Sequence, residues 1–144
     1  MIKKIYLAGG MSGLTWEEMT EWRRKARRAF KNITDGKIDV VSPTDHIPHR
    51  KPNSTDLVFD KEIMQFDIYG IRTSDLIIMN FNIPASIGTA IELGIAYENK
   101  IPVIGLNEKN TTLHPWQQEM CMRIFNDFDD LFIYVVEHFI ATVE

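Results

Sequence analysis

One glutamate, Glu92, stands among small residues near the start of a predicted helix. The segment 82–99 reads NIPASIGTAIELGIAYEN, in which Ser86 can cap the helix and Gly88 and Gly94 flank the acid. Small neighbours let a ligand or a second backbone approach closely, and the positive end of a helix favours an ionised carboxylate. An ionised carboxylate can act as a nucleophile. The alternative is that the small residues only permit tight packing of the helix on a sheet, with Glu92 exposed.

A second carboxylate, Asp67, falls inside the apolar stripe of another predicted helix. The stripe consists of Ile63, Met64, Ile68 and Ile71. Buried acids are rare unless they have a partner, so Asp67 could pair with backbone or with an arginine such as Arg72. The other interpretation is that Asp67 and Glu92 face one crevice, where two carboxylates in different surroundings can divide the roles of nucleophile and proton donor.

A glycine-rich turn, 9–13, lies between the first predicted strand and the first predicted helix. Backbone N–H groups at a helix start form a common seat for a phosphate. No acid ends the second strand, where a dinucleotide fingerprint requires one, and the chain has no Walker sequence. Leu14 stands where the G-x-S-x-G elbow of a serine hydrolase has its last glycine. We therefore expect a bound anion at this turn, but no cofactor.

Metal and thiol chemistry are not favoured by the remaining polar residues. His46 and His49 have a spacing that could suit a metal, yet no cysteine or acid joins them at metal-ligand spacing, so we expect no metal. The single cysteine, Cys121, is expected to be a small buried hydrophobe.

The elements that must position these residues alternate between strands and helices. We expect strands at 2–8, 39–42, 75–81, 102–106 and 122–126, and helices at 15–31, 56–72, from residue 86, at 116–120 and at 129–142. Arg23 is the one interruption in the core face of the first helix. The prolines of 43–53 predict a long irregular loop that could close over a site. The pattern predicts an α/β fold, a doubly wound five-stranded parallel sheet with helices on both faces, which binds ligands at the carboxyl ends of its strands.

Composition limits the class of protein. The 144 residues, 44% of them hydrophobic, suit one domain spanning 1–144. A net charge of -4 argues against a nucleic acid polymer or an anionic membrane as partner. The lone cysteine, an amino terminus that starts on a strand, and the lack of an apolar run of about 20 residues lead us to expect a soluble, cytoplasmic protein.

Three stretches together resemble the nucleoside 2-deoxyribosyltransferase family. They are IYLAG at 5–9, Asp67 followed by TSDLII at 73–78, and SIGTAIELG at 86–94. The similarity extends over nearly the whole chain and is strongest in residues 67–106. The resemblance implies that Glu92 is the catalytic nucleophile, which attacks the anomeric carbon and forms a glycosyl ester. It also implies that Tyr6 hydrogen-bonds this nucleophile and that Asp67 contacts the departing nucleobase.

One departure from the family bears on the substrate, which we expect to be a small nucleoside or nucleotide. An aspartate usually stands in the transferases where this chain has Ser86, and a serine there is similar to the related nucleoside 5'-monophosphate N-glycosidases. Losing a negative charge and gaining a donor favours an anionic ligand. The phosphate cradle would then be formed by Gly9, Gly10, Ser12, Ser86 and Gly88. A hydrolase of monophosphates, with water as acceptor, is thus the rival within this superfamily.

Two further expectations concern assembly and turnover. In the family a neighbouring subunit completes the site from the region after the fourth strand, which here falls on residues 111–116. A homodimer or a higher homo-oligomer is therefore expected. The other class of function is a nucleotide-binding or sensing module that keeps the fold without catalysing a reaction.

Overall fold

The computed structural model describes residues 2–46 and 60–141, with side chains described throughout except at Asp60. Its strands are β1 (Lys4–Gly9), β2 (Asp39–Val41), β3 (Leu76–Asn80), β4 (Val103–Leu106) and β5 (Arg123–Phe125). Its α-helices are α1 (Trp16–Ile33), α2 (Asp60–Arg72), α3 (Ile87–Glu98), α4 (Pro115–Met120) and α5 (Phe128–Val135). A 3-10 turn spans Pro43–His46 and a π-helical turn spans Val136–Ile140.

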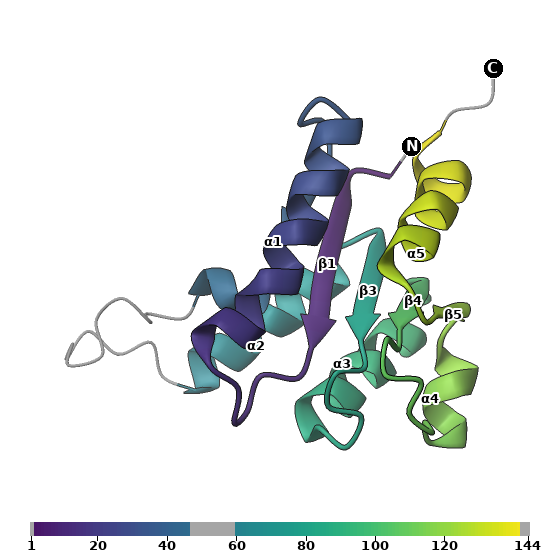
Figure 1. Ribbon diagram of the computed structural model, residues 1–144. Helices are drawn as coiled ribbons and strands as arrows, with labels where there is room; N and C mark the ends of the chain where they lie inside the picture. Colours follow the sequence, from purple (N-terminus) through teal and green to yellow (C-terminus); the bar gives the residue numbers. More distant parts are fainter. Residues whose placement is uncertain (1, 47–59, 142–144) are drawn as a thin grey trace.

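The five strands form one parallel sheet in the order β2-β1-β3-β4-β5, which confirms the predicted fold class. The strand order reverses between β1 and β3, because the chain first moves outward to β2 and then crosses back to β3. In sheets of this kind, ligands bind outside the carboxyl ends of the strands at such a reversal. Figure 1 shows these ends together at the lower edge of the sheet, with α1 and α5 in front of it and α2 and α3 behind.

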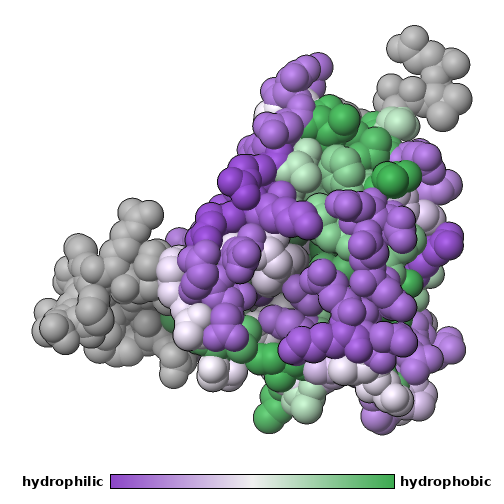
Figure 2. All heavy atoms as spheres, in the orientation of Figure 1, coloured by the Kyte–Doolittle hydropathy of each residue, from purple (hydrophilic) through white to green (hydrophobic). Residues whose placement is uncertain are grey.

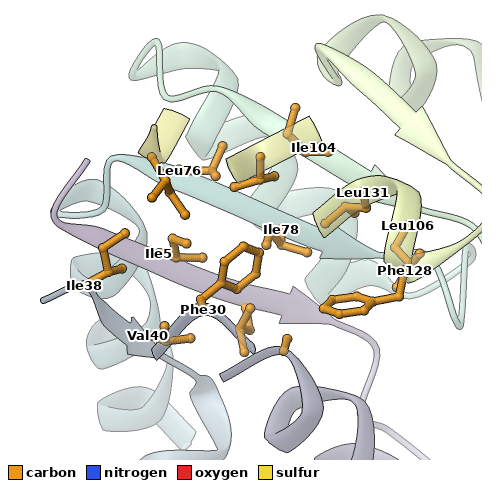
Figure 3. Close-up of a cluster of buried hydrophobic side chains, with 14 residues drawn as sticks. Ile5, Phe30, Ile38, Val40, Leu76, Ile78, Ile104, Leu106, Phe128 and Leu131 are labelled. Atoms are coloured by element: carbon orange, nitrogen blue, oxygen red, sulfur yellow. The ribbon is translucent and has the colours of Figure 1, made fainter. Parts of the chain in front are cut away.

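The face covered by α1 and α5 holds the larger apolar cluster. Ile5 and Leu7 project from β1 toward Phe30 of α1 and Leu131 of α5, and all four are completely buried. Figure 3 shows Phe30 at the centre of this cluster, between residues of the sheet and Phe128. Hydrophobic atoms also lie between α1 and α5 on the surface drawn in Figure 2. Because side chains alternate along a strand, Tyr6 must point to the opposite face.

The opposite face, under α2 and α3, holds a second cluster. Its buried members include Tyr6 and Ala8 of β1, Ile71 of α2, and Leu93 and Ala96 of α3. This cluster places the second half of α3 and the last half of α2 against the sheet, so the two helices carrying the predicted acids approach the same face.

Most predicted element positions are confirmed, and the differences lie at helix ends. Thr15 caps α1 through a capping box with Glu18, and Ser86 caps α3, as their sequences predict. The segment 43–53 was predicted to be irregular, but its first four residues form a 3-10 turn; the rest lies outside the described residues. The predicted closing helix 129–142 becomes a π-helical turn after Val135. Within the described ranges, no helix is long and apolar enough to span a membrane.

Candidate active site

Tyr6 and Glu92 meet on the α2–α3 face of the sheet. Tyr6 is only 2% exposed, and its hydroxyl donates a hydrogen bond of 3.0 Å to Oε2 of the half-buried Glu92. The two residues are far apart in sequence, and the crossover from β1 through β3 to α3 brings them together. The alternative that Glu92 is merely exposed is therefore wrong.

Asp67 of α2 lies close enough to both residues to affect their titration. Its Oδ1 is buried and has no hydrogen-bond partner among the residues that the structure describes. A structural pairing with Arg72 is not found, since Arg72 is exposed and no described ion pair joins it to Asp67. The predicted stripe of α2 is wrong at Met64, which is 53% exposed, and right at Ile71, which is buried.

Burial governs the electrostatics of the two acids. Desolvation, and then the charge of Asp67, raise the pKa of Glu92 to about 7, although the Tyr6 hydrogen bond opposes the rise. Desolvation raises the pKa of Asp67 to about 6. The pKa of Tyr6 is also raised, first by burial and then by both acids, so its hydroxyl remains a donor. Burial therefore opposes the ionisation of Glu92 that the positive end of the helix was predicted to favour.

Both acids are therefore able to exchange a proton near neutral pH. Two such carboxyl groups in one site can divide the roles of nucleophile and proton donor.

Gly70 of α2 lets the helix pass close over the Tyr6 ring. A Cβ atom at this position would lie 3.0 Å from Cε2 of Tyr6 and 3.2 Å from Cδ2. Glycine inside a helix is less favourable than alanine by about 0.5–1 kcal/mol. The missing side chain thus leaves the space in which the phenol ring lies, with its hydroxyl at Glu92.

Arg23 is a site neighbour whose role sequence reasoning missed. The residue appears in the sequence only as an interruption of an apolar face, yet it is 3% exposed. It influences the titration of both acids and of Tyr6. The one signal in the sequence is the charged residue on an apolar helix face, because burying a guanidinium is costly unless it has partners.

The glycine turn is held by Asn82 rather than left open. The Asn82 side chain accepts a 2.9 Å hydrogen bond from the Gly10 N–H and donates one of 3.2 Å to the Gly10 carbonyl. Gly10 is required by close packing, because a Cβ would lie 2.7 Å from Ile83. Gly9 ends β1, and Ser12 is exposed in the turn that follows. The Gly10 amide is therefore already used and is not a free phosphate donor.

The start of α3 is the more open anion seat. Ser86 Oγ accepts from the Thr89 N–H at 3.3 Å, and the Ser86 carbonyl accepts from Ala90. Within the described ranges, the amides of Ile87 and Gly88 have no such partner. Gly88 is exposed and lies four residues before Glu92, so the two share one helix face about 6 Å apart along the axis.

A hollow of about 510 Å³ lies beside this helix start. Its lining includes Ser86, Ile87 and Ile91 of α3 with His114 and Trp116 of the loop and helix α4. The contact is fixed by Gln117, whose side chain donates to the Pro84 carbonyl at 2.9 Å. Trp116 is 72% exposed. Residues 111–116 of the same chain thus border the start of α3, while Glu92 lies outside this hollow.

The remaining candidates do not form a site in the described part of the chain. Groups of three or more potential metal ligands are absent there. His46 stacks on Phe66 at 4.8 Å between ring centroids, and His49 lies outside the described residues. Cys121 is buried, and desolvation raises the pKa of its thiol to about 12, which makes a poor nucleophile, as predicted.

Comparison with known proteins places this arrangement in context. The model of one protein family, described as nucleoside 2-deoxyribosyltransferase, matches residues 5–132. Among proteins of curated function, none gives a significant match.

Several solved structures share the fold at low sequence identity. A 2-deoxyribosyltransferase from Bacillus psychrosaccharolyticus is 21% identical with a TM-score of 0.68, over 90% of each chain. A deoxyribosyltransferase from Leishmania mexicana is 22% identical with a TM-score of 0.66, over 95% of this chain and 99% of its own. A CMP N-glycosidase from Clostridium botulinum is 18% identical with a TM-score of 0.58, over 94% and 100%.

Proposed function

The chain belongs to the nucleoside 2-deoxyribosyltransferase family, and from this premise we propose that it cleaves the N-glycosidic bond of (deoxy)nucleosides or their 5'-monophosphates. The observation that carries the proposal is the partly buried hydrogen bond from the Tyr6 hydroxyl to Glu92, with Asp67 beside it. A carboxylate held by one neutral donor, next to a second acid of raised pKa, is suited to a displacement at a sugar carbon.

In the first step a Glu92 oxygen attacks C1 of the sugar. The bond from C1 to the base nitrogen breaks, its electron pair leaves with the base, and a glycosyl ester forms on Glu92. A nucleobase leaving as an anion is a poor leaving group, so a proton or a hydrogen bond at the base lowers the barrier. Asp67 supplies that proton and is left as a carboxylate, which can accept a proton in the second step.

Substrate binding places a proton on Asp67 and leaves Glu92 ionised. In the free site burial raises the pKa of both acids. A basic ring nitrogen next to Asp67 favours its protonated form, whereas positive charge developing at C1 favours ionised Glu92. Tyr6 keeps its proton throughout and aligns Glu92.

The second step resolves the ester by a second displacement at C1. A free base as acceptor regenerates a nucleoside, and water releases the sugar or sugar phosphate; either acceptor loses a proton to Asp67. Two displacements give net retention of configuration at C1.

A monophosphate substrate is favoured by the start of α3. The open amides of Ile87 and Gly88 and the Ser86 hydroxyl form an uncharged donor set. Gly88 is one helical turn from Glu92, a span that a sugar can bridge between its phosphate and C1. We include Gly9 and Ser12 in this cradle and assign Gly10 to holding the turn, because Asn82 occupies its amide.

A second copy of the chain is proposed to cover the hollow beside α3. Ile87, Ile91 and Trp116 are between 55% and 78% exposed around it. Large exposed apolar side chains gathered in one place are typical of protein interfaces. In this assembly residues 111–116 of the neighbour approach the site, and light scattering should report a dimer or a larger homo-oligomer.

Substrate turnover is the direct test. The protein is incubated with deoxynucleosides, with and without a free acceptor base, and with deoxynucleoside 5'-monophosphates, and released base is followed by chromatography. Base release that requires the acceptor base indicates transfer. Base release from monophosphates without any acceptor base indicates hydrolysis. Release from ribo-configured analogues tests the sugar preference. Tight nucleotide binding without any base release would contradict the proposal in favour of a sensing module.

A further inference from the structure

β2 is shorter than the strand it pairs with, which leaves part of β1 without a neighbour on that side. The pairing covers Lys4, Ile5 and Tyr6 only, and β2 ends at Val41. In a parallel strand, alternate carbonyls point to opposite neighbours. The Lys3 carbonyl accepts from Asp39 of β2, so the carbonyls of Leu7 and Gly9 point to the same side, beyond the end of β2.

Arg23 of α1 occupies that position. Its Nε and Nη2 donate to the carbonyls of Leu7 and Gly9 at 3.4 and 3.2 Å, and its Nη1 donates to the Met19 carbonyl at 2.7 Å. The planar guanidinium can present parallel donors as an adjacent strand would. The carbonyls on either side of Ala8, two residues beyond Tyr6, are therefore held by one side chain.

The charge of Arg23 is unusual on this helix. Arg24 and Arg27, exposed and half-buried, pair with Glu17 at 2.6 Å and with Asp45 at 2.7 Å. Arg23 is buried and has no carboxylate within ion-pair distance in the described ranges. An uncompensated buried cation is costly, and more distant negative charges act strongly on it in a low-dielectric interior. The charges that act on it include Glu92 and Asp67.

We propose that Arg23 is a positioning residue for the site: it replaces the missing strand beside β1, which fixes Tyr6, and its buried charge stabilises one negative charge on the Glu92–Asp67 pair. Only one part of this inference rests on the proposed function, namely that the negative charge stabilised by Arg23 takes part in catalysis. The contacts with β1 and the effect on the two acids exist whether or not the protein turns over a substrate.

The groups that act on the pair, directly or through Arg23, come from three elements: β1, α1 and the 3-10 turn. Tyr6 contributes a neutral hydroxyl from β1, and Arg23 contributes its charge from α1. His46, at the end of the 3-10 turn, acts on Asp67, and Asp45 acts on Arg23. Among these groups only His46 and Arg23 can carry positive charge, and Arg23 is the one that is buried.

The test is a titration of the Glu92 carboxyl, followed by ¹³C NMR in glutamate-labelled protein and assigned by its loss in Glu92→Gln. Arg23→Gln keeps an amide donor for the β1 carbonyls but removes the charge, and Arg23→Lys keeps the charge but loses the planar fork. Arg24→Gln is the matched control at an exposed position of the same helix.

We expect Arg23→Gln to raise the pKa of Glu92 by about one unit, because the nearby positive charge is gone. Arg23→Lys and Arg24→Gln should leave it within about 0.3 units of the parent protein. Arg23→Lys should still lower the melting temperature, because one ammonium cannot satisfy both carbonyls.

Two results would overturn the inference. One is a folded Arg23→Gln protein whose Glu92 titrates as in the parent. The other, which decides the matter if Arg23→Gln does not fold, is an Arg23→Lys protein with an unchanged melting temperature or a Glu92 pKa shifted as far as one unit. Absence of turnover in the parent protein would contradict the proposed function and would leave these titrations valid.

Discussion

The two faces of the sheet differ in what their buried side chains do. On the α1–α5 face the buried cluster around Phe30 consists of aliphatic and phenylalanine side chains. On the α2–α3 face the buried cluster includes Tyr6, which is bonded to Glu92 and lies near Asp67. β1 contributes to both clusters, because its side chains alternate: Ile5 and Leu7 point to one face and Tyr6 points to the other. One face therefore supplies stability, and the other accepts buried polar groups that cost stability and make chemistry possible.

The outer surfaces of the helices repeat this difference. On α2 and α3, six large hydrophobic side chains are 46–78% exposed: Met64, Phe66, Tyr69, Ile87, Ile91 and Tyr97. On α1 and α5, the corresponding residues are Ile33 and Ile133. The face that holds the acids is thus also the face with apolar surface left to cover, as an assembly completed by a second copy requires.

The largest effect should come from the acid on the α2–α3 face. Glu92→Gln keeps the size of the side chain and an acceptor for the Tyr6 hydroxyl, but removes the nucleophile. We expect kcat to fall about 10⁴-fold, or about 5.5 kcal/mol in activation free energy, measured by base release. Glu98→Gln, at an exposed position of the same helix, is the control and should retain the parent rate. A Glu92→Gln enzyme within tenfold of the parent would remove Glu92 from the mechanism.

The second-largest effect should come from a substitution in the apolar cluster on the α1–α5 face. Phe30 is completely buried and contacts the rings of Phe128 and Phe132, with centroids 6.4 and 5.1 Å away. Phe30→Ala should lower the free energy of unfolding by about 4 kcal/mol, measured by urea denaturation. The rate per folded molecule should stay the same, because Phe30 lies on the face of the sheet opposite Tyr6 and Glu92. Glu21→Ala, on the exposed side of α1, should change neither quantity. A loss of rate in folded Phe30→Ala would show that the two faces are not separate.

The pH dependence of stability should also distinguish the faces. The folded-state pKa of Glu92, about 7, exceeds the ordinary value of 4.5, so the folded protein binds more protons between these values and loses stability as pH rises through them. Glu92→Gln avoids this cost. We expect the variant to be more stable than the parent by on the order of 2 kcal/mol at pH 8, with a smaller difference at pH 5.

Denaturation at both pH values measures this effect. Glu98→Gln should show no comparable change between them. An equal gain from Glu92→Gln at pH 5 and pH 8 would mean that ionisation of Glu92 is not what costs stability on this face.

The smallest effect concerns the substrate within the α2–α3 face. Ser86→Asp keeps a good helix cap and adds a negative charge at the start of α3. Relative to the neutral cap Ser86→Asn, we expect kcat/KM to fall about tenfold for 5'-monophosphates and to change little for nucleosides. A similar loss on both substrates would argue against a phosphate at this helix start.

Local features of the site could be predicted from sequence because they depend on near neighbours. The cap at Ser86 and the partial burial of Asp67 on the same helix side as Ile71 follow from turn chemistry and from helical periodicity. The alternation of strands and helices is equally local, and it was sufficient to predict the parallel sheet.

Features that join distant segments could not be predicted in this way. The Tyr6–Glu92 hydrogen bond joins residues 86 positions apart, and no local sequence pattern predicts it. Tyr6 was a candidate site residue only because of the resemblance to a family. Arg23 is understood only once β2 is seen to end at Val41. The raised pKa of Glu92 depends on how closely the surrounding side chains exclude water, which a helix-dipole argument does not include.

The close passage of α2 over the Tyr6 ring has an evolutionary consequence. Gly70 leaves room for the phenol ring, so a Cβ at position 70 would press on the ring whose hydroxyl is bonded to Glu92. A lineage that replaces Tyr6 with a smaller residue is released from this constraint and can regain helix propensity with alanine at position 70. Positions 6 and 70 should therefore covary among homologues, although they are 64 positions apart in the chain.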